Sequence, residues 1–238
     1  MQRTTGGLTL LLWSVLLFGG PAPAAEEAGR LYRIMEKGHY GYIDRAGKMV
    51  VPPQFKTASD FSEGRAGVLA GDKFGFIDQT GKVVIQPQFD KVAEFSEGLA
   101  AVETGGKWGF VDPNGKMVIS PRFTSAGNFY EDRAWVKVDD KYGYLDKQGK
   151  IAISPRFETS GNFAEGLVPV RMGGKWGYVD KAGKLLVEPQ FKEASRFTEG
   201  LGRVQLALGE WGFIDRKGRE GHRRARACCR QTGVEAPD

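Results

Sequence analysis

Short apolar runs recur along most of the chain, separated by turn residues. Residues 82–85, 116–119 and 150–153 are typical: each begins with lysine and continues with aliphatic, often β-branched residues. Runs of four or five such residues suit β-strands and are too short for helices. The pattern therefore predicts an all-β chain.

An aromatic-glycine pair marks a regular repeat. The pairs are spaced by 34 residues four times and then by 35. They are Tyr40-Gly41, Phe74-Gly75, Trp108-Gly109, Tyr142-Gly143, Trp176-Gly177 and Trp211-Gly212. Self-similarity at a fixed period of this length is the signature of a repeat architecture. Five full units are expected, at residues 38–71, 72–105, 106–139, 140–173 and 174–207, with a partial sixth unit ending near 218.

Each unit predicts three antiparallel strands. The first strand starts at the aromatic-glycine pair and ends in an Asp-x-x-Gly turn such as Asp112 to Gly115, whose residues suit a tight hairpin. The second strand follows and is expected to end at a Pro-x-Phe motif, because proline cannot donate to a sheet ladder. A second phenylalanine comes six residues later, then a Glu-Gly turn, then the third strand.

A unit of 34 residues cannot bury its own apolar face, so neighbouring units must stack. The first aromatic of each unit and the two phenylalanine columns are the expected core, with Trp108 and Trp176 as members. We expect an open, superhelical or solenoid-like array, because propeller blades usually have four strands and these units predict three. A closed, propeller-like ring is the alternative, since the chain begins with an apparent third strand at residues 31–34 and ends with a first one.

The two ends of the chain differ from the repeat. Residues 1–24 have the positive start, apolar run and small-residue cleavage site of a secretory signal peptide, and residues 25–37 form a lead-in with one strand. The repeat domain spans 38–218, and 219–238 is a basic tail expected to be disordered. Seven Lys or Arg and three acidic residues in 216–238 account for nearly all of the chain's net charge of +5. We therefore expect export to the periplasm or outside, with no transmembrane span in the mature chain.

These residues carry a family resemblance. The order Lys-Trp-Gly-Phe-Val-Asp, Gly-Lys, Pro-x-Phe and Phe-x-Glu-Gly-Leu, over about residues 31–218, resembles the WG-repeat (KWG) family. The resemblance implies an all-β repeat array that mediates interactions, and it brings no catalytic residues. Tyrosine or phenylalanine replaces the tryptophan in three units.

Candidate chemistry in the sequence is sparse. The aspartates of the Asp-x-x-Gly turns are expected to be structural. The glutamates of the Glu-Gly turns, such as Glu97, could supply a carbohydrate-active enzyme with carboxylates, but that mechanism needs two carboxylates in unlike environments and a repeat supplies like ones. Only two histidines occur, and no metal-ligand spacing or glycine-rich phosphate loop is present. We expect no catalytic residue, no cofactor and no metal.

Two lysine columns remain as binding candidates. One is Lys73, Lys107, Lys141 and Lys175, directly before the aromatic-glycine pairs; the other follows the turns at Lys48, Lys82, Lys116, Lys150 and Lys184. A row of lysines could hold an anionic polymer or simply protect strand edges from aggregation. The sequence thus favours a non-catalytic binding or scaffold module of the cell envelope or extracellular space, with a protein or an anionic envelope polymer as partner and no nucleic acid. The alternatives are the carbohydrate-active enzyme and a purely structural envelope repeat.

Overall fold

The computed structural model describes residues 29–206 and 209–221, and these contain only β-strands and turns. The predicted signal peptide and most of the basic tail lie outside the described residues. Chain contacts divide the protein into two units, 1–30 and 31–238, and every strand belongs to the second. Within the described part, no helix is long and apolar enough to cross a membrane.

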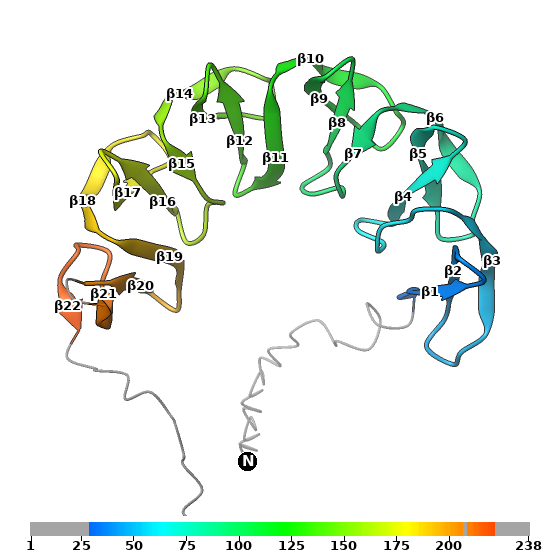
Figure 1. Ribbon diagram of the computed structural model, residues 1–238, viewed down its shortest axis with the longest axis horizontal. Coiled ribbons are helices and arrows are strands. Elements are labelled where there is room, and N and C mark those ends of the chain that lie inside the picture. The colour runs from blue at the N-terminus through cyan, green and yellow to red at the C-terminus, as the bar shows by residue number, and fades with distance from the viewer. Residues whose placement is uncertain (1–28, 207–208, 222–238) are drawn as a thin grey trace, which may run out of the picture. The chain divides into compact units, whose positions relative to one another are not determined.

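The strands form six antiparallel sheets that follow one another in chain order (Figure 1). A full sheet has four strands, which we call a, b, c and d in chain order. The a strands are β7 (Lys91–Val92), β11 (Ser125–Tyr130), β15 (Thr159–Ser160) and β19 (Glu193–Thr198). The b strands are β1 (Tyr32–Glu36), β4 (Arg65–Ala70), β8 (Ala100–Thr104), β12 (Arg133–Val138), β16 (Leu167–Met172) and β20 (Leu201–Gln205).

The c and d strands carry the sequence motifs. The c strands are β2 (His39–Ile43), β5 (Lys73–Asp78), β9 (Lys107–Val111), β13 (Lys141–Leu145), β17 (Lys175–Asp180) and β21 (Trp211–Ile214). The d strands are β3 (Met49–Phe55), β6 (Val83–Phe89), β10 (Met117–Phe123), β14 (Ile151–Phe157), β18 (Leu185–Phe191) and β22 (Glu220–Gly221). The first two sheets lack a named a strand.

The grouping of strands differs from the predicted unit. A sheet joins the third strand of one sequence unit to the first two of the next, so β8 pairs with β9 and β9 with β10. The lead-in strand is confirmed as β1, which pairs with β2. The array is open, because no pairing joins the first sheet to the last within the described residues. The three-strand argument used against a propeller was nevertheless wrong, since four of the sheets have four strands.

Proline does not end the d strand, contrary to the sequence prediction. Strand β10 continues through Pro121 to Phe123, and it bulges there: Phe110 faces Ile119 while Trp108 faces Phe123. The signature glycine lies under this bulge, because a Cβ on Gly109 would come within 2.4 Å of the Ile119 carbonyl oxygen. The d strand is an edge of its sheet, where proline is tolerated and discourages pairing with other chains.

The core lies between consecutive sheets. Its largest members are the second aromatic of each c strand and the phenylalanine that precedes the next b strand, which pack edge to face at centroid distances of 4.7–5.1 Å. The pairs are Tyr42–Phe61, Phe76–Phe95, Phe110–Phe129, Tyr144–Phe163 and Tyr178–Phe197. Trp108 and Trp176, predicted to be core members, are only half-buried and pack against the buried clusters from their margin. Both are the second residue of their strand, beside a turn at the end of the sheet.

Three buried tyrosines, Tyr42, Tyr144 and Tyr178, also satisfy their polar ends. Their hydroxyls donate to the carbonyls of Ser59, Gly161 and Ser195 at 2.7–2.8 Å. Burial raises the pKa of all three phenols above the ordinary value. Phe76 and Phe110 fill the same position in other sheets, so the ring supplies the packing and the hydroxyl adds a bond.

Candidate binding surface

The a–b and c–d turns lie at one end of the strands, and the b–c turns lie at the other. The strand order a-b-c-d with antiparallel neighbours requires this separation. Glutamates and turn aspartates therefore share one end of each sheet, and the first lysine column lies at the opposite end. We describe the two ends in turn.

The turn aspartates are structural, as predicted. Asp112 Oδ1 accepts bonds from the backbone N–H of Asn114 and Lys116, both at 2.9 Å. Asp44, Asp78, Asp146, Asp180 and Asp215 repeat this arrangement. The bonds fix the c–d hairpin, and the neighbouring Gly115 takes the positive φ of 82° that the turn needs.

The glutamates connect consecutive repeats, which the sequence analysis did not foresee. Glu63 accepts bonds from the N–H of Glu97 at 2.6 Å and of Gly98 at 2.9 Å. Glu97 accepts bonds in the same way, from the N–H of Glu131 at 2.5 Å and of Asp132 at 2.9 Å. Each turn that donates these bonds has two successive residues with positive φ, and in this geometry adjacent N–H groups form an anion-binding concavity. We call this series the glutamate ladder.

The ladder continues with single bonds in the later repeats. Glu131 accepts from the N–H of Gly166 at 2.8 Å, and Glu165 from that of Gly200 at 2.9 Å. Two lysines add ion pairs to it: Lys147 to Glu97 at 3.1 Å and Lys181 to Glu131 at 3.3 Å. The sequence feature that relates to the ladder is the glutamate before glycine, which recurs every 34 residues. That recurrence does not reveal a contact between units.

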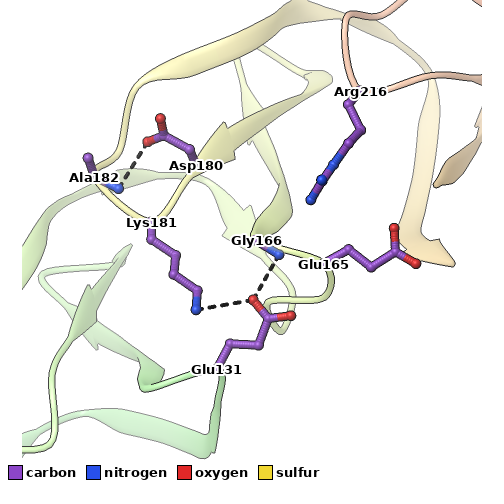
Figure 2. A pocket seen from close by; sticks show the side chains of 7 residues that line it. All are labelled: Glu131, Glu165, Gly166, Asp180, Lys181, Ala182 and Arg216. Carbon is purple, nitrogen blue, oxygen red and sulfur yellow. Dashed lines mark hydrogen bonds and ion pairs between the residues drawn. The ribbon is translucent and has the colours of Figure 1, made fainter. Parts of the chain in front are cut away.

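An open groove of about 640 Å³ lies on the ladder (Figure 2). Its lining is Glu131, Glu165, Gly166, Asp180, Lys181, Ala182 and Arg216. Lys181 forms an ion pair with the Glu131 carboxylate, which also accepts a hydrogen bond from the Gly166 N–H. Asp180 accepts a hydrogen bond from the N–H of Ala182. Two of the three carboxylates in the groove, Glu131 and Asp180, thus accept bonds from the groove's own backbone.

The predicted lysine column lies at the other end of the sheets and is exposed. Lys73, Lys107, Lys141 and Lys175 each open a c strand. Lys73 forms a short ion pair with Asp90. Lys107, Lys141 and Lys175 make no ion pair within residues 29–206 and 209–221. The charge of Lys73 is therefore neutralised by an acidic partner, whereas the charges of the other three lysines are not neutralised within the described chain.

Half-buried rings accompany these three lysines. Trp108, Tyr142 and Trp176 directly follow them and leave part of their surface accessible. We name these six residues, three lysines and three aromatic residues, the Lys–aromatic edge. An exposed ammonium can contact an anionic surface through charge and hydrogen bonds, and an accessible ring can contact a hydroxyl-rich surface by stacking.

Comparison with solved structures shows likeness in fold alone. Kluyveromyces marxianus Hsv2 has a TM-score of 0.51 and 8% identity, covering 82% of this chain and 72% of that one. Kluyveromyces lactis Hsv2 has a TM-score of 0.50 and 8% identity, covering 80% and 72%. BamB from Moraxella catarrhalis has a TM-score of 0.48 and 12% identity, covering 79% and 73%. No curated protein matches the chain significantly.

A family model provides the assignment. The model described as "WG containing repeat" matches five consecutive segments, 40–74, 74–108, 108–142, 142–176 and 176–207. These segments cover most of the chain, and each begins at the first aromatic residue of a c strand. The chain belongs to the WG-repeat family.

Proposed function

We propose that this protein is a non-catalytic binding module, exported to the cell envelope or beyond, whose Lys–aromatic edge contacts an anionic envelope polymer or an acidic protein segment. The observation that carries the proposal is the contrast between the two ends of the sheets. The carboxylates of the ladder bind the protein's own backbone, whereas Lys107, Lys141 and Lys175 have no internal partner in the described chain.

The same contrast supports a binding function over catalysis. Glycoside hydrolysis needs an acid and a base, or an acid and a nucleophile, in unlike environments. Glu63, Glu97, Glu131 and Glu165 all accept backbone N–H bonds from the following repeat, so all four share one structural role. The enzyme alternative gains no support from this arrangement.

The spacing of the edge suits an extended partner. Successive sheets repeat the same lysine and ring, so an ordered polymer can meet the same contact several times. Several weak contacts on one chain combine through effective concentration, which gives useful affinity without any single strong site.

Co-sedimentation with isolated cell-envelope material tests the proposal. We would compare the full chain with a version ending after Gly221, which keeps β22 and removes most of the basic tail. Both versions are expected to pellet with the material, and added salt should weaken both to a similar degree. If only the full chain pellets and salt releases it, the tail's charge is responsible and the proposed edge is not the binding element.

A further inference from the structure

Every internal sheet has a forward face toward the next sheet and a backward face toward the previous one. In the sheet of β7–β10, Leu99 and Phe110 point forward and pack with Phe129. Val102 and Val111 point backward, into the cluster that contains the previous sheet. Forward and backward faces are thus complementary surfaces, used repeatedly within one chain.

The forward face of the last sheet is more exposed than the forward faces of the earlier sheets. Phe213 holds the c-strand position whose other five members are at most 1% exposed, yet it is half-buried. It makes no ring contact within the described residues, whereas each of the other five packs on a phenylalanine. Leu201 is 41% exposed, while Leu167, its equivalent one repeat earlier, is 2% exposed.

The backward face of the first sheet is likewise more exposed than the equivalent faces of the later sheets. Ile43 is half-buried, although the residues at its position in the other five sheets are 0% exposed. Those residues are Ile77, Val111, Leu145, Val179 and Ile214. Tyr32, which pairs with Ile43 across β1 and β2, is 42% exposed. Ile43 and Tyr32 are therefore apolar surface of the kind that other sheets bury.

The residues at the two ends are also complementary in size. Tyr32 holds the b-strand place that Gly202 holds in β20, since Tyr32 pairs with Ile43 as Gly202 pairs with Ile214. A Cβ on Gly202 would meet the Phe197 ring at 2.8 Å and Tyr178 Oη at 3.0 Å. This position therefore points at the aromatic pair of the preceding interface.

The first sheet supplies a large ring where the other sheets have small residues. Ala66, Ala100, Ala134, Val168 and Gly202 occupy the position of Tyr32 in the later sheets. The phenylalanine column that fills the other interfaces has no member before Phe61, because residue 27 is glutamate. A forward face docked on the first sheet would meet the Tyr32 ring in the space that this phenylalanine occupies elsewhere.

We propose that the forward face of the last sheet binds the backward face of the first sheet of a second copy of this chain. Phe213 and Leu201 of one copy then pack on Tyr32 and Ile43 of the next. In the part of the chain that the structure describes, forward faces pack on backward faces, so a second copy is the partner whose chemistry fits. Such an interface is heterologous and head-to-tail, and it extends into a fibre or a ring according to the rotation between copies.

Sedimentation velocity of the purified chain, from about 1 to 200 μM, tests the proposal, because a single interface of this kind is expected to be of moderate affinity. The wild-type weight-average mass should rise with concentration beyond that of a dimer. Phe213→Glu and Tyr32→Glu should each remain monomeric. Met117→Glu, at an exposed position on the edge strand β10, is the matched control and should associate like the wild type.

Mixing the two blocked variants distinguishes head-to-tail from symmetric association. The Phe213→Glu chain keeps its first-sheet face and the Tyr32→Glu chain keeps its last-sheet face, so a one-to-one mixture should form dimers and nothing larger. Circular dichroism of each variant confirms that it is folded. A wild-type chain that stays monomeric throughout, association that persists in both variants, or a mixture that stays monomeric would each overturn the proposal.

Discussion

The aromatic residues that stand out in the sequence motif are not the most deeply buried ones in the structure. Substitutions can test this ranking by burial. Phe129 in β11 is 0% exposed and packs edge to face on Phe110 of the neighbouring sheet at 5.1 Å. Phe129→Ala removes a buried ring and its aromatic contact at once. Such replacements cost about 3–5 kcal/mol in buried positions. Trp108 is half-buried, so Trp108→Ala should cost about 1–2 kcal/mol, roughly half of a full burial term.

Urea denaturation followed by far-ultraviolet circular dichroism compares the two variants without relying on the fluorescence of Trp108. Because Phe129 joins two sheets, its loss should also lower cooperativity, as expected where repeats are coupled through neighbour interfaces. A broader transition for Phe129→Ala than for Trp108→Ala is the predicted result. Equal destabilisation by the two substitutions, or a larger effect of Trp108→Ala, would refute the assignment of the core.

Three further predictions concern the ladder, the buried tyrosines and the signature glycine. Glu97→Gln should lower the free energy of unfolding by about 1 kcal/mol in urea titrations, since it weakens two charge-assisted bonds at a partly exposed site; no change would contradict a role in joining repeats. The buried tyrosines keep their protons to higher pH when folded, so stability should be intact below the unfolded pKa of about 10 and fall above it. In thermal melts across this pH range, Tyr178→Phe should make the loss of stability with rising pH less steep. At neutral pH it should cost about 1 kcal/mol, because the hydrogen bond from the Tyr178 hydroxyl is lost. An unchanged slope of stability against alkaline pH would argue against the burial of Tyr178. Gly109→Ala should cost about 1–3 kcal/mol because its Cβ would meet a backbone carbonyl, and a neutral result in the same titration would mean that the bulge can move.

The sequence predicted the repeat, the strands and the turns because each depends on local chemistry. The Asp112 turn needs an acceptor followed by a residue with positive φ, and both are visible within four positions. Strand grouping was not visible, since a periodic sequence can be divided at any phase. The short strand β7, only Lys91–Val92, carries no apolar pattern of its own.

The misjudged features involve contacts that local patterns do not encode. Trp108 and Phe110 lie two positions apart in β9, so alternation places both on one face and cannot rank their burial. The continuation of β10 through Pro121 depends on a bulge against Gly109. The ladder bond from Glu97 to Glu131 joins residues 34 apart. These features appear only when the repeats are stacked.

The binding role of the lysine column stays a prediction, but its position in the fold can be compared with the sequence. The lysine column was identified from its spacing, and the structure places all four members at equivalent strand starts. The sequence could not separate Lys73, which pairs with Asp90, from Lys107, Lys141 and Lys175. That distinction depends on Asp90, which lies in the link between the d strand β6 and the a strand β7.

The most direct test of the proposed function removes equal charge from opposite ends of the sheets. One variant replaces Lys107, Lys141 and Lys175 with serine; its matched control replaces Lys116, Lys150 and Lys184, which are also exposed. Affinity for cell-envelope material is measured for both. At about 1 kcal/mol per lysine near an anionic surface, the first variant should bind about a hundredfold more weakly, and the control should stay close to the wild type. Equal losses in both variants, or no loss in the first, would contradict binding through the Lys–aromatic edge.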